Sequence, residues 1–220
     1  MQSLASMLTS STFRKPDLTP EQWAENDAMV ERMEAEERAR EALRRLQSAD
    51  IPRGYMDARI TDERVAEWAS SPTKGLFLNG GVGRGKTHNA CAVLVDAVGK
   101  GMSAKFVTFD DVLRECRASF QNLDTERAII GRYANVGMLC IDDMGKERVT
   151  EWSLPIVFAV INKRSMNDKP TIVTTQYTGR QLVERMTVNG DSETARAIVS
   201  RFFEYTRITL EGKDWRRGNQ

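Results

Sequence analysis

The residues best suited to chemistry lie in "GLFLNGGVGRGKTHNACAVLVDAVGKG", residues 75–101. Gly80, Gly85, Lys86 and Thr87 fit the pattern G-x-x-x-x-G-K-[ST], after an apolar run and before an Ala/Val/Leu-rich segment. Glycines let successive backbone N–H groups turn inward around an anion, and the following helix adds its N-terminal N–H groups. We expect Lys86 to reach the β- and γ-phosphates and the Thr87 hydroxyl to bind Mg²⁺. A glycine-rich turn without a ligand is the alternative, but Gly-Lys-Thr at this spacing serves no packing purpose. The pattern therefore predicts a site for ATP or ADP with Mg²⁺, and its predicted contacts are Gly80, Gly81, Val82, Gly83, Arg84, Gly85, Lys86, Thr87 and His88.

A second chemical feature is the acidic pair that follows the apolar run in "VGMLCIDDMGKE". In a parallel sheet the carboxyl ends of the strands face the ligand, so both carboxylates should emerge beside the phosphates. We expect Asp142 to hold Mg²⁺ and Asp143 to orient or deprotonate the attacking water. An acidic turn after a strand is common by itself, but about fifty residues after a complete phosphate loop it favours a nucleotide-hydrolysing enzyme.

Two further polar residues are candidates for catalysis. Gln176 ends the apolar stretch in "KPTIVTTQYT" and could position water, although it could also simply end a strand. Arg201 interrupts the apolar positions of a helix predicted over residues 193–205. An arginine that reaches into a neighbouring subunit's site would stabilise charge on the transferred phosphoryl group, and the alternative is a surface arginine.

Elements able to position these residues can be read from alternating patterns. Apolar runs at 76–78, 104–109, 136–141, 171–175 and 207–210 alternate with helical patterns, which predicts an α/β fold with a parallel sheet and helices on both faces.

The N-terminal part of the chain has a different character. "TPEQ" has the residues of a capping box with proline at the first helical position, and predicts the start of a charged helix over about 20–47. Its apolar stripe is thin, which favours docking of a partner protein over a merely solvated helix. Pro52 breaks the pattern, so we divide the chain into a helical extension, 1–50, and a nucleotide-binding domain, 51–220.

Composition limits the remaining possibilities. The 220 residues are 40% hydrophobic, enough for a core, and the formal net charge of +1 requires any basic surface to be local. Three scattered cysteines and a single histidine argue against disulfides, zinc and histidine-based catalysis. No apolar run approaches a membrane span, so we expect a cytoplasmic protein with no membrane partner.

Taken together, the motifs resemble the bacterial replicative helicase loaders of the DnaC/DnaI family and the related transposition ATPase IstB, a branch of the AAA+ ATPases. "GVGRGKTHNACAV" resembles the family's G-x-G-T-G-K-T-H-L-A loop, and "MLCIDDMGKE" its L-L-I-I-D-D-L-G Walker B segment. "IPRGYMDARI", "VINKRSMNDKPTIVTTQYT" and "AIVSRFFEYTRITLEGKDWR" resemble its remaining segments, so the match covers roughly residues 51–216.

The resemblance implies a five-stranded AAA+ domain without a full C-terminal lid, an arginine finger at Arg201 and a sensor arginine at Arg216. It also implies contacts with single-stranded DNA from the segment before Walker B, where Arg114, Arg117 and Phe120 share a helix face. The alternative is that Phe120 belongs to the core and the arginines are only solvated. Gln176 stands where the family has a sensor asparagine, and Asp143 is shorter than the glutamate of most AAA+ enzymes. Both departures predict slow hydrolysis, suited to a switch.

Function is therefore expected to be ATP-dependent loading of the hexameric replicative helicase onto single-stranded DNA, with self-assembly through Arg201. The location would be the bacterial cytoplasm, or an infected cell if the gene belongs to a phage. A transposition helper ATPase, and a nucleotide-binding adaptor or inhibitor of host replication, remain alternatives. A small-molecule kinase has no support beyond the phosphate loop.

Overall fold

The computed structural model describes residues 19–119, 122–212 and 214. The contacts divide the chain into two compact units, 1–41 and 42–220. Helix α2, Pro20–Ser48, begins in the first unit and ends in the second. Its start is the predicted capping box: the Thr19 N–H donates to Gln22 Oε1 at 2.9 Å, and the Gln22 N–H donates to Thr19 Oγ1 at 3.3 Å. The apolar side chains of this part of the helix are exposed, and they are Trp23, Met29, Val30 and Met33.

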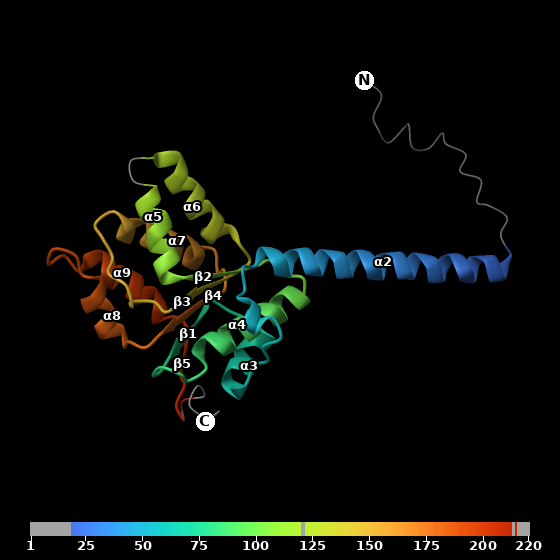
Figure 1. Cartoon of the computed structure of the whole chain (residues 1–220), viewed down its shortest axis with the longest axis horizontal. Helices are drawn as coiled ribbons and strands as arrows, with labels where there is room; N and C mark the ends of the chain where they lie inside the picture. Colours follow the sequence, from blue (N-terminus) through green and yellow to red (C-terminus); the bar gives the residue numbers. More distant parts are fainter. Residues whose placement is uncertain (1–18, 120–121, 213, 215–220) are drawn as a thin grey trace, which may run out of the picture. The chain divides into compact units, whose positions relative to one another are not determined.

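The second unit contains a sheet of five parallel strands in the order β2-β3-β4-β1-β5 (Figure 1). The strands are β1 (Gly75–Asn79), β2 (Ala104–Thr108), β3 (Met138–Asp142), β4 (Thr171–Thr175) and β5 (Thr206–Thr209). This arrangement confirms the predicted five-stranded parallel sheet. Register pairs Asn79 with Thr175 and Thr108 with Asp142, so the carboxyl ends of the central strands meet at one edge.

Helices cover both faces of this sheet (Figure 1). They are α3 (Glu63–Ser70), α4 (Lys86–Gly99), α5 (Phe109–Ala118), α6 (Leu123–Asn135), α7 (Ser153–Met166), α8 (Gly179–Met186) and α9 (Glu193–Phe202), with a short 3₁₀ turn, η1 (Arg53–Tyr55). Alternate residues of each strand point to opposite faces. In β3, Leu139 and Ile141 pack in the core under α5–α9, whereas Met138 and Cys140 pack in the core under α3 and α4.

The segment after α2 belongs to the sheet domain by its contacts. Ala49 and Ile51 are buried in the core under α3 and α4. The Phe106 N–H donates to the Ala49 carbonyl at 2.7 Å, which pairs this segment with the outer edge of β2, and Asp50 forms an ion pair with Lys105. The two compact units meet within α2, between residues 41 and 42, and the division into domains at residue 50 stays a prediction.

Among the residues that the structure describes, no helix combines the length and the apolar composition that a bilayer span requires.

Candidate nucleotide-binding site

The glycine-rich loop connects β1 to α4 and wraps around a buried lysine. Lys86 is 7% exposed, and its Nζ donates to the carbonyls of Gly80 and Gly81 at 2.8 Å each. Gly80 has a φ of 151°, and a Cβ there would lie 2.5 Å from the Leu210 carbonyl oxygen, so only glycine fits. Gly85, with a φ of 78°, precedes the first turn of α4 in the left-handed conformation. The motif therefore forms the strand–loop–helix cradle expected of a phosphate site.

The first carboxylate of the acidic pair lies directly beside the loop. Thr87 Oγ1 lies 3.0 and 3.1 Å from the two Asp142 carboxylate oxygens, and Thr174 Oγ1 donates to Asp142 Oδ1 at 2.6 Å. Burial raises the pKa of Asp142 above its ordinary value and the nearby Asp143 raises it further, while the Thr174 and Thr87 hydroxyls lower it. Strand β3 thus delivers a desolvated carboxylate to the threonine of the phosphate loop.

The second carboxylate points into the open part of the site. Asp143 has a left-handed backbone with a φ of 56°, and its N–H donates to Thr174 Oγ1 at 2.9 Å. Its carboxylate lies 3.6 Å from Lys146 Nζ, and both side chains are about half exposed. This backbone conformation is uncommon for a residue other than glycine, and it separates the directions of two adjacent carboxylates.

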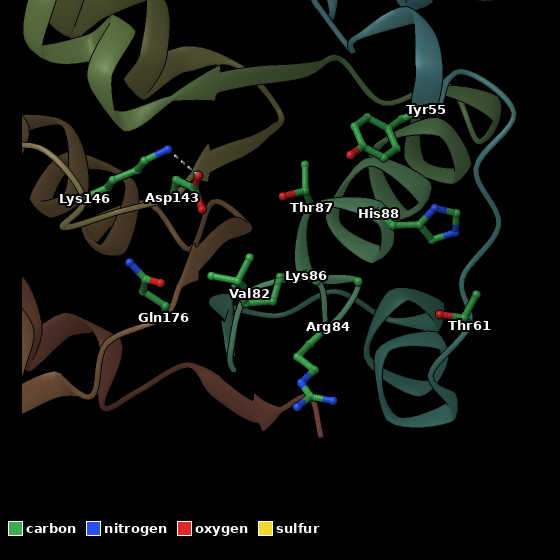
Figure 2. A pocket seen from close by; sticks show the side chains of 12 residues that line it. Tyr55, Thr61, Val82, Arg84, Lys86, Thr87, His88, Asp143, Lys146 and Gln176 are labelled. Atoms are coloured by element: carbon green, nitrogen blue, oxygen red, sulfur yellow. Dashed lines mark ion pairs between the residues drawn. The ribbon is translucent and has the colours of Figure 1, made fainter. Parts of the chain in front are cut away.

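A pocket of about 430 Å³ joins these features (Figure 2). Its lining residues are Tyr55, Thr61, Val82, Gly83, Arg84, Gly85, Lys86, Thr87, His88, Asp143, Lys146 and Gln176. Figure 2 shows Asp143, Lys146 and Gln176 on one side of the loop residues and Tyr55, Thr61 and His88 on the other. The structure thus brings residues 82–88 of the predicted loop, Asp143 and Gln176 to one cavity. Gly80, Gly81 and Asp142 are not among the lining residues that the structure describes.

Three lining residues were not singled out from the sequence: Tyr55, Thr61 and Lys146. Tyr55 lies in the quoted "IPRGY" segment, and Lys146 follows the acidic pair by three residues. His88 Nε2 lies 2.9 Å from the Arg59 carbonyl, and the His88 and Tyr55 rings meet edge to face with centroids 6.2 Å apart. These residues form an aromatic and polar wall opposite the acidic side.

Gln176 and Arg201 have different positions relative to this pocket. Gln176 lines it and donates from Nε2 to Tyr177 Oη at 2.9 Å. Arg201 is not among the described lining residues: its Nη2 donates to Asn162 Oδ1 at 2.7 Å, and its guanidinium lies 5.4 Å from the Phe158 ring centroid. A role for Arg201 would therefore belong to another subunit's site, and it stays a prediction.

Arginines predicted to contact DNA are paired with an acid of their own helix. Arg114 and Arg117 lie 2.6 and 3.8 Å from the Asp110 carboxylate. Both are about half exposed or more, so pairing leaves them accessible. Phe120 and Arg216 lie outside the described residues.

The donor set suits a magnesium nucleotide. Mg²⁺ prefers oxygen ligands, and the Thr87 hydroxyl and Asp142 carboxylate supply them next to the lysine that would meet the phosphates. Positive φ values at Gly80, Gly83 and Gly85 give the backbone the concave form of an anion cradle.

Comparison with known proteins supports this interpretation. The family model for IstB-like ATP-binding proteins matches residues 43–220. Replicative helicase loader DnaC of Escherichia coli (strain K12) is 25% identical over 119 residues, covering 54% of this chain and 49% of that protein. A putative ATP-binding protein of insertion sequence IS5376 from Geobacillus stearothermophilus is 30% identical over 142 residues, covering 64% and 54%. The chain thus spans about half the length of these curated relatives.

A solved structure is similar in fold. The crystal structure of DnaI superposes with a TM-score of 0.62 at 21% identity, covering 74% of this chain and 95% of that one. The resemblance inferred from the motifs is confirmed, and with it the AAA+ form of the P-loop fold. The chain belongs to the family of IstB-like ATP-binding proteins.

Proposed function

We propose that the protein is an ATP-dependent loader of the hexameric replicative helicase onto single-stranded DNA, and that ATP binding and slow hydrolysis act as its switch. The observation that carries the nucleotide part is the contact of Thr87 with Asp142 beside the buried Lys86. The likeness to a helicase loader over 119 residues supports the choice of partner.

Each residue of the site has a defined part in this proposal. Lys86 exchanges the Gly80 and Gly81 carbonyls for phosphate oxygens, and Thr87 and Asp142 hold Mg²⁺. Bound Mg²⁺ would neutralise charge that develops on the phosphates. Asp143 orients the attacking water, and Gln176 places it from the neighbouring strand.

Slow turnover follows from the state of Asp143. Its carboxylate is shared with Lys146 at 3.6 Å, so it is less available to water than a free carboxylate. Gln176 likewise donates one of its two amide hydrogens to Tyr177, which restricts how its amide can turn toward water.

Assembly and DNA contacts complete the loader proposal. Arg201 would enter a neighbouring subunit's site, as an arginine finger does. Arg114 and Arg117 would exchange the Asp110 carboxylate for DNA phosphates, which would make binding depend on salt.

A transposition helper ATPase is the second candidate, because the chain is 30% identical to the insertion-sequence protein. Such a protein would use the same nucleotide site but bind a transposase. The two candidates therefore differ in the partner, and the partner decides between them.

Light scattering after size exclusion tests the partner directly. The full chain is mixed with the host's replicative helicase, Mg²⁺ and ATP, beside a variant that lacks residues 1–41. That truncation is preferable to removal of 1–50, because Ala49 is buried in the sheet domain and its carbonyl accepts from the Phe106 N–H. We expect a large complex that is lost in the truncation. Absence of a complex at micromolar concentrations would refute the loader proposal, and a complex with a transposase would establish the second candidate.

A complex alone does not separate a loader from an inhibitor. Transfer of the helicase to single-stranded DNA in the presence of ATP is expected of a loader. A stable complex that blocks this transfer would instead identify an inhibitor.

The nucleotide part is tested with Lys86→Ala. Removal of the ammonium group should weaken MgATP binding by at least about 100-fold, since hydrogen bonds to charged groups contribute roughly 1.5–3 kcal/mol each. Binding that is unchanged in isothermal titration calorimetry would refute the assignment of this loop to phosphate.

A further inference from the structure

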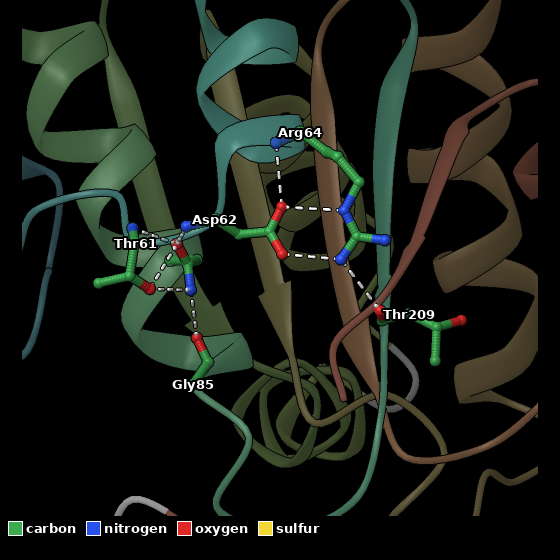
Figure 3. A network of polar contacts seen from close by, with 6 residues as sticks. Thr61, Asp62, Arg64, Gly85 and Thr209 are labelled. Carbon is green, nitrogen blue, oxygen red and sulfur yellow. Dashed lines mark hydrogen bonds and ion pairs between the residues drawn. The ribbon is translucent and has the colours of Figure 1, made fainter. Parts of the chain in front are cut away.

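Asn89 occupies an unusual position on the buried side of the phosphate loop. It lies in the first turn of α4 and is 2% exposed. Its Oδ1 accepts from the Thr61 and Asp62 N–H groups at 2.8 and 3.3 Å. Its Nδ2 donates to the Gly85 carbonyl at 3.0 Å (Figure 3), the last glycine of the loop. One amide therefore joins two segments that are far apart in the sequence.

The segment held by Asn89 is the linker between η1 and α3, residues 56–62. It contains no regular element of its own, and its side toward the pocket supplies Thr61. The Thr61 hydroxyl lies 3.0 Å from Asn89 Nδ2 and 3.2 Å from Asn89 Oδ1. The neighbouring His88 holds the Arg59 carbonyl at 2.9 Å, so two consecutive side chains of α4 fix this linker.

Removal of the Asn89 amide would leave the linker's N–H groups without a partner on α4. Thr61 is exposed and Asp62 is half-buried, so without Asn89 their N–H groups would turn toward water instead of toward α4. The Asp62–Arg64–Thr209 contacts at the other end of the network would remain, because they involve different atoms (Figure 3).

We propose that Asn89 is a positioning residue that holds the linker as the nucleoside-side wall of the pocket. Affinity for the base and ribose then depends on Asn89, while affinity for the phosphate chain depends on the loop and Lys86. The inference rests on the nucleotide binding proposed above and adds the group that makes the site select a nucleotide over a bare phosphate chain.

The test compares MgATP with magnesium tripolyphosphate as ligands of the full chain, by isothermal titration calorimetry. The variant is Asn89→Leu, which removes all the amide's hydrogen bonds. Leucine is the residue that follows the histidine in the family motif G-x-G-T-G-K-T-H-L-A, where this chain has Asn89. We expect about tenfold weaker binding of MgATP, with tripolyphosphate binding changed by less than about twofold. A tenfold change corresponds to about 1.4 kcal/mol, the magnitude of one or two net hydrogen bonds.

Arg64→Ala is the matched control. It removes the guanidinium from the same network but leaves the amide and its contacts with Thr61 and Gly85 in place. Its ratio of the two affinities should equal that of the wild type. If Asn89→Leu fails to fold, Asn89→Ala, which introduces no bulk, gives the same comparison.

The outcomes are distinct. Equal weakening of both ligands would overturn the proposal, because Asn89 would then act on the loop through Gly85. Unchanged binding of both would also overturn it. Hydrogen exchange gives a second readout: the amides of the linker should exchange faster in Asn89→Leu than in Arg64→Ala, and equal rates would count against the proposal. A wild type that binds neither ligand would instead refute the proposed nucleotide site.

Discussion

Two arginines, Arg164 on α7 and Arg201 on α9, should differ in how much their substitution destabilises the protein. Arg164 is fully buried, whereas Arg201 is partly exposed and packs against Asn162 and Phe158. Arg164 stands in the segment "VINKRS" that resembles the loader family, so its sequence position alone does not separate a structural from a functional role. We predict that Arg164→Met is strongly destabilising and that Arg201→Ala is not.

The magnitude follows from the acceptors of Arg164. Its guanidinium donates to one hydroxyl and to several carbonyls of the α6–β3 turn and the residue before β4; the closest partners are Tyr133, Val136, Gly137, Pro170 and Thr171, at 2.6–3.1 Å. Burial lowers the pKa of Arg164 to about 10, which still leaves it charged at neutral pH. Methionine has a similar length but no donor, so these acceptors would lose the guanidinium, although the Pro170 carbonyl would keep its bond from the Leu139 N–H. Removing one side of such a network costs about 3–5 kcal/mol, a large part of the roughly 5–15 kcal/mol that stabilises a typical domain.

Urea unfolding followed by circular dichroism measures both variants. Arg164→Met should lower the free energy of unfolding by about 3–5 kcal/mol with an unchanged m-value, and Arg201→Ala by less than about 1 kcal/mol. Arg201→Ala should instead lower ATP hydrolysis in assembled protein while MgATP binding stays constant. Equal losses of stability in the two variants, or a loss below about 1 kcal/mol for Arg164→Met, would refute the distinction.

Three further predictions concern the site and the core. Lys146→Met should free the Asp143 carboxylate and raise the rate of ATP hydrolysis. The increase should be no more than about fivefold, because an exposed ion pair is worth at most about 1 kcal/mol. A fall in the steady-state rate would show instead that Lys146 serves the reaction. Asp142→Asn should abolish Mg²⁺-dependent hydrolysis yet raise the melting temperature without Mg²⁺, since burial disfavours the charged form; a lower melting temperature would contradict this. Burial raises the pKa of Cys91 to about 12 and that of Cys116 to about 11. At pH 8 neither thiol should therefore react with a disulfide reagent until the protein unfolds, and the absorbance of the released chromophore measures this reaction.

Much of the sheet could be predicted because apolar runs bounded by polar residues are strong indicators of buried parallel strands. The errors lie at the element ends. Phe109 was assigned to a strand, but it opens α5 because the Thr108 hydroxyl accepts from the Asp111 N–H and caps the helix. Val136 was likewise assigned to a strand, whereas its carbonyl accepts from the buried Arg164. Hydrophobicity alone does not distinguish these roles.

The phosphate side of the site was predictable because its residues are contiguous in the motif. The opposite wall was not, since Tyr55 and Thr61 reach the pocket only through long-range contacts such as those of Asn89 and His88.

Pairing of Arg114 with Asp110 has the i,i+4 spacing of helical ion pairs, so the sequence "DDVLR" contained that information.

The end of β3 explains why this site should favour a cation. Asp142 and Asp143 are adjacent, and burial together with the neighbouring charge raises the pKa of Asp142. Asp143 adopts a left-handed backbone that turns its carboxylate toward Lys146. The Thr87 and Thr174 hydroxyls can offset part of the cost of the buried charge, but they carry no positive charge themselves. Lys86 already lowers the pKa of Asp142, and a divalent ion held by Thr87 and Asp142 would offset the repulsion that is left. The raised pKa of Asp142 and the proposed affinity of the site for Mg²⁺ therefore have the same physical origin.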